Sequence, residues 1–565
     1  MSVLFPSLRG YQGSWLRNDL VAGATVWAVL VPEALAYATI AGAPPVVGLY
    51  AAAPALVLYA MFGSSRHLVV GPMSATAALS AGTIATFADP SGDNYVALTA
   101  ALAIVTGVVA MIAGLLRLGF LAGFISEPVL KGFIVGLALT IIMGQLPKLF
   151  GVDAASGNFF EKLWGLVTAL GETHWPTFVV GFLSLALVLG LRRYLPLVPG
   201  SLVAVALGVI VVMLFDLDQK GVEVVGTITP GLPHVGLPSG VGLDQYLSLA
   251  GPAFGVVLVG FAEGLGAAKT YAARAGYDVD ANKELLGLGA ANAGSGLASG
   301  MVVNGSLSKT AVNGGAGAKS QVSGLFVAVL TIITLLFLTG LFEQLPEATL
   351  GAIVVAAVIE LVDIKSLRRL YGVWSARLSA IYGKAARADF TAAIAAMFGV
   401  LIFDTLPGLV IGIVISFGLL LYRSSRPNIA TLGRTAEGHW HDSGRFEGSV
   451  PEPGIVVLRV EGGLFFANAD AIRERVVAAA APPDVHGVVL DCESVPFVDV
   501  TAAEMIERLR TVLAGQGKQL VLARDIGQVR DVLGRAGDDV DAATVYPSVS
   551  AAVDAVRTAP PSATG

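Results

Sequence analysis

The sequence predicts a polytopic α-helical membrane protein that carries a soluble α/β domain after its membrane region. Three observations support this fold class. Only 13% of the 565 residues are charged and 55% are hydrophobic, whereas soluble domains carry about 25% charged residues. Long apolar segments recur between Leu20 and Tyr422, and an alternating strand–helix pattern begins at Gly454. Because a segment that is apolar around its whole circumference needs lipid as its solvent, we expect the first region to span a membrane.

Twelve apolar segments are interpreted as membrane spans. They lie near residues 20–40, 46–62, 98–116, 122–147, 175–191, 199–215, 249–268, 284–301, 320–341, 348–362, 389–404 and 406–422. Two further segments, 73–87 and 306–313, are shorter than the roughly 20 apolar residues that a crossing requires. Together they make about fourteen elements, an even number that places both ends of the chain on one side. The first 20 residues lack the pattern of a cleavable signal peptide, so the first segment is expected to remain as a span.

Basic residues are distributed unequally between the two sets of loops. With the N-terminus in the cytoplasm, the outer loops contain only Lys148, Lys162 and Lys220, and the other basic loop residues fall on the inner side. Cytoplasmic loops favour Lys and Arg. We therefore expect a multi-pass protein of the plasma (inner) membrane, surrounded by lipid, with cytoplasmic N- and C-termini.

The composition changes after the last apolar segment. Residues 427–453 are polar and contain Gly, His, Ser and Pro, which predicts a linker. From Gly454 the strand-like stretches GIVVLRVEGG, HGVVLDCESV and KQLVLAR alternate with helical stretches, the last of them IGQVRDVLGRAG. This pattern predicts one sheet with helices packed on it. The expected domains are 1–426 in the membrane and 454–558 outside it, with a disordered tail at 559–565.

The two short segments share one pattern. VVGPMSATAALSAG covers residues 69–82, and VVNGSLSKTAVNGGAG covers residues 302–317. Each has a β-branched pair, then a Gly or Pro break, then a small-residue helix that starts with Ser. Broken helices at corresponding places in two halves of a chain are the best sequence indication of a transporter's binding site. Free N–H groups at the helix starts near Ser74 and Ser306 would favour an anion there; two irregular loops are the alternative.

Three ionisable residues lie inside apolar segments, where a charge is costly and is by default functional. Glu33 directly follows Pro32, which kinks a helix and frees backbone groups. Glu263 lies deep in VVLVGFAEGLGAAKTY, and Lys309 lies one turn into the second short helix. The two glutamates are candidates for proton coupling, with a structural hydrogen bond as the alternative. Lys309 is either the counter-charge of an anion or a side chain that extends to the inner interface.

The chain is similar to one known family at several places. AGATVWAVLVPEALAYATIAGAPPVVGLY, GSSRHLVVGP, NKELLGLGAANAGSGL and NGSLSKTAVNGGAGAKSQVSG together resemble the sulfate permease (SulP, solute carrier 26-like) family of anion transporters. VPFVDVTAAEMIERL resembles a STAS domain, a module related to anti-sigma-factor antagonists that these carriers bear. The resemblance covers nearly the whole chain. It implies a seven-plus-seven inverted repeat with two half-helices (the UraA-like fold), core and gate subdomains, a homodimer, and elevator-like movement of the core.

The resemblance also implies roles for individual residues. Ser74 and Ser306 fall at the two half-helix starts that flank the substrate. Lys309 falls where the family usually has Arg, so the positive charge is kept while the bidentate fork is lost. The residues implied to surround the substrate are Ser74, Ala75, Gly305, Ser306 and Lys309.

The coupling ion and the regulatory site are likewise implied. Glu33 falls where many members have Gln, and members with Glu there look proton-coupled. Glu263 falls at the acidic position of the eighth span, and Ala267 replaces the hydroxyl residue that sodium-coupled members place one turn later, so we expect a proton. In the STAS domain, Thr501 follows Asp499 at the position where stand-alone relatives are phosphorylated, a modification that adds roughly −1.5 to −2 charge. That Thr501 caps the following helix is the alternative, and the one we favour.

These observations predict a secondary active transporter of small anions of the sulfate, bicarbonate or dicarboxylate class, driven by proton symport through elevator-type alternating access. The alternatives are a passive chloride or anion channel or exchanger of the same family, a nucleobase carrier of similar fold, and a membrane scaffold that presents the STAS domain to regulatory proteins. The sequence shows no catalytic nucleophile, phosphate-binding loop or metal cluster, and its single cysteine, Cys492, lies in an apolar strand-like stretch. We therefore expect no enzyme activity, cofactor, metal or nucleic-acid partner.

Overall fold

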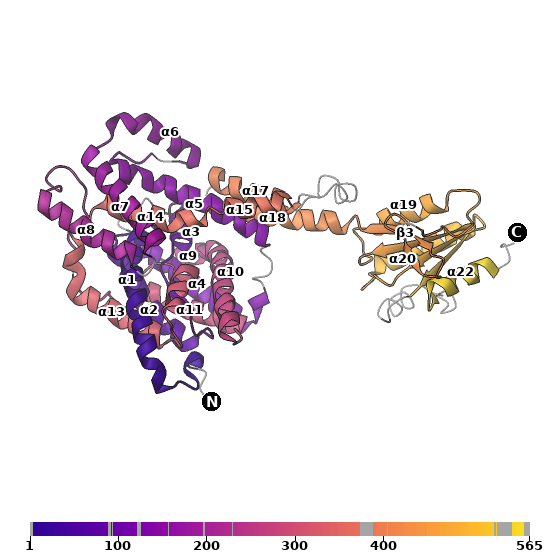
Figure 1. Ribbon diagram of the computed structural model, residues 1–565, viewed down its shortest axis with the longest axis horizontal. Coiled ribbons are helices and arrows are strands. Elements are labelled where there is room, and N and C mark those ends of the chain that lie inside the picture. Colours follow the sequence, from indigo (N-terminus) through magenta and orange to yellow (C-terminus); the bar gives the residue numbers. More distant parts are fainter. Residues whose placement is uncertain are drawn as a thin grey trace. The chain divides into compact units, whose positions relative to one another are not determined.

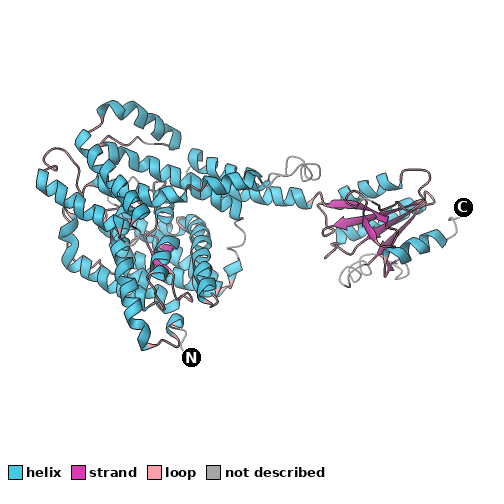
Figure 2. Ribbon diagram, viewed as in Figure 1, coloured by secondary structure: helices cyan, strands magenta, loops and turns pink. Residues whose placement is uncertain are grey.

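The computed structural model describes residues 4–88, 92, 94–120, 126–155, 157–195, 198–228, 230–372, 388–403, 405–446, 448–524, 527 and 545–558. These residues form two compact units, one within residues 1–371 and 389–415 and the other within residues 372–388 and 416–565. The first unit is helical apart from one pair of very short strands, and the second contains a larger sheet (Figure 2). The start of the expected span 122–147, nearly all of the helix IGQVRDVLGRAG and the tail 559–565 lie outside the described residues.

The helices that precede the larger sheet are drawn in order from indigo to orange in Figure 1. Their bounds are α1 (Leu16–Ile40), α2 (Val46–Phe62), α3 (Ser74–Ile84), α4 (Tyr95–Leu115), α5 (Glu127–Phe150), α6 (Phe159–Ala169), α7 (Trp175–Tyr194), α8 (Gly200–Phe215), α9 (Leu243–Ser248), α10 (Ala250–Ala275), α11 (Ala281–Leu297), α12 (Leu307–Gly315), α13 (Val322–Ile333), α14 (Glu347–Val358), α15 (Ile364–Gly372), α17 (Ala388–Phe403) and α18 (Thr405–Ser424).

A helix lies at each segment that was expected to span the membrane, and α3 and α12 lie at the two short segments. Among the described residues, six helices are long and apolar enough to cross a membrane, and several shorter apolar helices accompany them. The count of about fourteen spans stays a prediction. Three described helices that precede the larger sheet were not predicted: the amphipathic α6, the short α9 and the polar α15. None of these has the fully apolar circumference on which the sequence argument depended.

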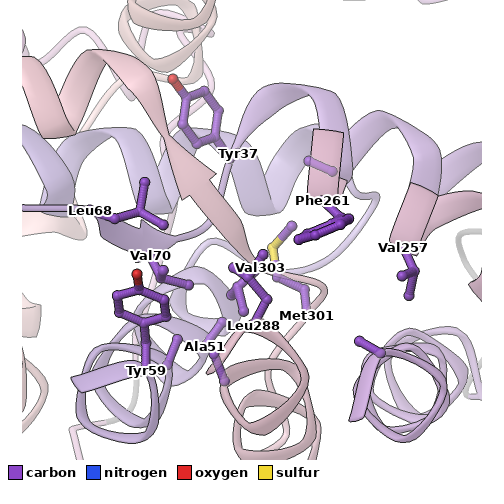
Figure 3. Packing of buried hydrophobic residues seen from close by; sticks show 14 of the residues in the cluster. Tyr37, Ala51, Tyr59, Leu68, Val70, Val257, Phe261, Leu288, Met301 and Val303 are labelled. Carbon is purple, nitrogen blue, oxygen red and sulfur yellow. The ribbon is translucent and has the colours of Figure 1, made fainter. Parts of the chain in front are cut away.

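Small residues explain the close packing of α11 against α4. A Cβ added at Gly107 would lie 2.4 Å from the backbone nitrogen of Ala293, and one at Gly296 would lie 2.4 Å from the carbonyl oxygen of Ala100. Helices in lipid approach one another through such residues because apolar burial gives them no advantage over lipid contact. Beside this contact, Tyr37, Tyr59, Leu68 and Val70 of other elements belong to one buried cluster, part of which Figure 3 shows.

A buried carboxylate fixes the loop between α2 and the first short strand. Glu284, near the start of α11, accepts hydrogen bonds from the Tyr59 hydroxyl at 2.6 Å, from the Ser64 hydroxyl at 2.7 Å, and from the backbone nitrogens of Ser64 and Ser65 at 2.8 and 3.0 Å. Hydrogen bonds to an ionised group are stronger than neutral ones. This cluster therefore anchors the chain a few residues before it enters the centre of the unit.

The second unit is a six-stranded sheet with helices packed on it. Its strand order is β4-β3-β5-β6-β7-β8; β5 to β8 are parallel, and β3 is antiparallel to both of its neighbours. The bounds are β3 (Asn428–Arg434), β4 (Trp440–Asp442), β5 (Ile455–Glu461), β6 (Gly487–Asp491), β7 (Gln519–Ala523), β8 (Val545–Tyr546), α19 (Ala469–Ala480), α20 (Val500–Ala514) and α22 (Val549–Thr558). Cys492 is buried, as its apolar surroundings indicated.

The segment 427–453, interpreted from its composition as a linker, is instead largely part of this sheet. It contains β3 and β4, and Ala430 and Leu432 of β3 are buried in an apolar cluster with α22. The segment is polar because it includes two turns and an edge strand, β4, which pairs on one side only. The average composition of the segment does not reveal the alternation in NIATLGR, by which two apolar side chains of β3 point inward.

Candidate functional site

Two strands of three residues each pair inside the first unit (magenta in Figure 2). β1 (Val69–Gly71) is antiparallel to β2 (Asn304–Ser306), with Val69 opposite Ser306 and Gly71 opposite Asn304. Both strands are completely buried. Backbone groups inside a membrane must be paired, and this ladder pairs those of the non-helical parts of both broken segments. The sequence indicated the two segments as equivalents, and the structure brings them into direct contact.

Each strand leads into a helix at the place where the sequence predicted one. α3 begins at Ser74 and α12 directly after Ser306. Ser306 is the N-cap of α12, because its hydroxyl accepts a hydrogen bond from the backbone nitrogen of Lys309 at 3.2 Å. The start of α3 has no side-chain cap. The four small residues expected near the substrate, Ser74, Ala75, Gly305 and Ser306, are all buried.

Lys309 forms a buried ion pair with Glu33 of α1. Its Nζ lies 2.7 Å from Glu33 Oε2, in a contact that lacks the alignment of a hydrogen bond. Nζ also donates to the backbone oxygen of Pro72 at 3.2 Å and lies 4.9 Å from the centre of the Tyr37 ring. Lys309 is 1% exposed and Glu33 8%. The alternative that Lys309 extends to the inner interface is therefore wrong.

The position of this pair in the helices explains why both charges are needed. Lys309 lies in the first turn of α12, where the positive end of the helix dipole disfavours a cation. The Glu33 carboxylate offsets that penalty, and breaking a buried pair by removing one partner typically costs about 3–5 kcal/mol. Lys309 thus has one negatively charged neighbour in the described structure. A substrate anion could pair with Lys309 only if it displaced the Glu33 carboxylate or if Glu33 were protonated.

Sequence reasoning missed three groups that complete the surroundings of Lys309. Tyr37 lies four residues after Glu33 on α1, so the helical period places both side chains on one face. Thr310 accepts a hydrogen bond from the backbone nitrogen of Val69 at 3.0 Å and so joins α12 to β1. The Pro72 carbonyl is a backbone group. The helical spacing could have revealed Tyr37, whereas the other two depend on the pairing of β1 with β2.

Glu263 lies on α10, the helix that packs against β2. A Cβ added at Gly264, the next residue, would lie 3.1 Å from the Asn304 side chain, which places this part of α10 directly against the strand. Among the described residues, Glu263 Oε2 has no hydrogen-bond partner, and Glu263 forms no ion pair with Lys309. Ala267 is buried on the same helix. Glu263 therefore lies on a helix that packs against the site but is not part of the Lys309 pair.

In the second unit, Thr501 is exposed in the first turn of α20. The N-cap of this helix is Asp499, whose Oδ1 accepts a hydrogen bond from the backbone nitrogen of Ala502 at 2.8 Å. The expectation that Thr501 caps the helix is therefore wrong. Asp499 was available in the sequence two residues earlier and is an equally good capping residue, which places Thr501 inside the helix.

Comparison with known proteins gives two family matches along the chain. The sulfate permease family matches residues 16–381, and the STAS domain matches residues 450–552. A probable sulfate transporter of Mycobacterium tuberculosis is 36% identical over 554 residues, which cover 97% of each chain. The high affinity sulfate transporter 1 of Stylosanthes hamata is 31% identical over 558 residues, which cover 93% of this chain and 81% of the relative.

Solved structures with the same fold accompany these relatives. The murine solute carrier 26 family member A9 anion transporter, solved in an inward-facing state, has a TM-score of 0.87 at 23% identity and covers 98% of this chain and 93% of that one. The transmembrane domain of a cyanobacterial bicarbonate transporter, BicA, has a TM-score of 0.60 at 23% identity and covers 71% of this chain and 98% of that one. These two likenesses show a shared architecture of the membrane helices and, in the first case, of the C-terminal domain as well.

Proposed function

The chain belongs to the sulfate permease family, and on this premise we propose that it is a secondary active transporter that takes up small anions together with protons. The observation that carries the proposal is the buried Lys309–Glu33 ion pair at the start of α12. Members of the family are transporters and not enzymes. The named relatives, a probable sulfate transporter and a high affinity sulfate transporter, favour sulfate within the class of sulfate, bicarbonate and dicarboxylates.

Proton coupling follows from competition for Lys309. While Glu33 is ionised, its carboxylate occupies the ammonium group, and the pair carries no net charge. When Glu33 takes up a proton, Lys309 loses its anionic partner, and a substrate anion can take its place beside the starts of α3 and α12. Anion and proton therefore enter together. For a doubly charged anion, a second proton on Glu263 would balance the remaining charge.

The site residues we assign to the substrate are Ser74, Ala75, Gly305, Ser306 and Lys309, with Glu33 and Glu263 as the proton sites. A passive channel needs no protonatable partner for its lysine, so the buried pair favours a coupled carrier. β1, β2, α3 and α12 are tied to α1 through Lys309, which supports their movement as one core in an elevator-type cycle. The matching patterns of the two broken segments support a seven-plus-seven inverted repeat.

The cellular setting belongs to the same proposal. We place the protein in the inner membrane as a homodimer with both termini in the cytoplasm, on the basis of its loop charges and its family. The STAS domain is the regulatory module, and Thr501, exposed in the first turn of α20, is its phosphorylation site. A phosphate there would interact favourably with the helix start.

The experiment uses purified protein in liposomes with labelled sulfate, bicarbonate or succinate. We expect an inward proton gradient, applied with the membrane potential clamped, to accelerate the uptake of at least one of these anions. Glu33→Gln is the matched variant and should make uptake independent of the gradient. Uptake that is equally fast with and without the gradient in the wild-type protein would exclude proton coupling.

A further inference from the structure

A small cavity lies beside β2 in the first unit. The volume that the centre of a water-sized sphere can occupy in it is about 20 Å³. Its walls are formed by α3, α4, α10, α11 and the chain around β2. Val257, Phe261, Leu288 and Val303, labelled in Figure 3, are among its apolar lining residues. The polar residues in its wall are Thr76, Thr106, Asn292 and Asn304.

Two of these polar side chains are buried without a partner. Thr106 is 2% exposed and Asn304 1%, and within the described part of the chain neither Thr106 Oγ1 nor Asn304 Nδ2 has a hydrogen bond. Asn292 differs, because its amide exchanges two hydrogen bonds of 2.9 Å with the backbone of Val303. Leaving a polar group buried and unpaired costs about 1–3 kcal/mol. Thr106 and Asn304 therefore both lack a partner beside the same small space.

We propose that this cavity binds one water molecule that bridges Thr106 of α4 and Asn304 of β2. A water site requires about 10–15 Å³ of such space and two to four polar neighbours. The Asn304 amide can donate to the water oxygen, the water can donate to the Thr106 hydroxyl, and Thr76 supplies a third polar neighbour. The described residues that line the cavity carry no charge, which disfavours an ion because a buried charge needs a compensating partner.

The water would make Asn304 a positioning residue. Asn304 pairs with Gly71 and directly precedes Gly305 and Ser306. A bridge to α4 would therefore fix the strand that carries part of the proposed anion site. This consequence rests on the proposed function, whereas the presence of the water does not.

The first test is the thermal stability of two full-length variants in detergent. Thr106→Val keeps the shape of the side chain and removes the hydroxyl that the water would bond. Thr83→Val is the matched control, because the Thr83 hydroxyl on α3 is also buried and unpartnered but does not line the cavity. We expect Thr106→Val to lower the unfolding temperature by about 1–3 °C and Thr83→Val to leave it unchanged or raise it. A rise or no change in Thr106→Val, or an equal fall in both variants, would overturn the proposal.

The second test observes the site directly. A cryo-EM map of the wild-type protein that resolves ordered waters elsewhere in the core should show density about 3 Å from both Thr106 Oγ1 and Asn304 Nδ2. The map of Thr106→Val should lose that density. Empty space there in a map that shows other buried waters would refute the bridge. An unaltered sulfate KM in Thr106→Val, with the water present in the wild type, would instead refute only the positioning role of Asn304.

Discussion

Replacing Glu33 by Gln should lower the stability of the anion-free protein and, at the same time, strengthen its binding of anions. The substitution keeps the size of the side chain and removes the charge that lies 2.7 Å from Lys309 Nζ. The Pro72 carbonyl and the Tyr37 ring remain as partners of the ammonium group. Because a Gln oxygen can still accept a hydrogen bond from Lys309, we expect the free energy of unfolding to fall by about 2–4 kcal/mol, near the lower end of the range for breaking a buried pair.

Anion binding should stabilise the Glu33→Gln variant against unfolding by more than it stabilises the wild-type protein. A ligand that binds only the folded state at 100 times its Kd stabilises it by about 2.7 kcal/mol. In the wild type, part of that gain is lost because the anion must replace the Glu33 carboxylate. In Glu33→Gln no such competitor exists. On the proposed competition, the wild-type affinity for sulfate should therefore be higher at lower pH, and this part of the pH dependence should be absent from the variant.

The assay is thermal unfolding of the purified protein during sulfate titration at several pH values, with chloride held constant. For the unfolding temperature without sulfate, Glu263→Gln is the control, because it makes the same chemical change on α10 without breaking an ion pair; its sulfate response instead tests the second proposed proton site. If Glu33→Gln unfolds at the wild-type temperature without sulfate, and if its sulfate-induced rise equals that of the wild type at every pH, then Glu33 does not hold Lys309 in the resting protein. Competition between Glu33 and the anion for Lys309 would then be excluded.

Three further predictions concern other residues of the first unit. Lys309→Ala should lose most sulfate-induced thermal stabilisation and Lys309→Arg should keep part of it; an unchanged Kd for sulfate in the alanine variant would place the anion elsewhere. Gly107→Ala should cost about 1–3 kcal/mol by overpacking, because its Cβ would lie 2.4 Å from a backbone nitrogen, whereas Gly144→Ala, with open space around it, should be neutral or stabilising in thermal unfolding. Trp164, 71% exposed on the amphipathic α6, should lie at the lipid interface. Its fluorescence, which is identified by the signal lost in Trp164→Phe, should be quenched by lipids brominated near the headgroup. Absence of quenching would place α6 in water.

The helices of the first unit could be predicted because lipid imposes a simple rule on the sequence. A span is apolar around its whole circumference, so its position follows from composition along the chain. The rule does not apply to α6, where Phe160 and Trp164 are exposed beside Glu161 and Lys162, nor to β3, where a polar segment buries only alternate residues. α6 was missed because it is amphipathic and largely exposed, and β3 was missed because it buries only some of its side chains, so neither has the uniformly apolar composition of a span.

The site could be predicted in its parts but not in its connections. The repeated pattern located both helix starts, and the cost of charge in an apolar span singled out Glu33, Glu263 and Lys309. The β1–β2 ladder could not be derived, because three-residue strands have no periodicity to detect, and register is a property of the pair. The wall of the cavity behind Asn304 likewise combines residues from five elements whose proximity only the fold determines.

The pairing of Glu33 with Lys309 changes the role that can be assigned to each residue. From the sequence alone, Glu33 is an isolated carboxyl in an apolar span. Lys309 is an isolated positive charge to which an anion could bind. In the structure each is the partner of the other, so the resting site needs neither a proton nor an anion to be neutral. Adding an anion alone leaves three charges in a buried space, and adding a proton alone leaves Lys309 unpaired; both states are costly. For a singly charged anion, only the joint arrival of proton and anion would keep every charge paired, and this pairing of charges is the physical basis of the coupling proposed above.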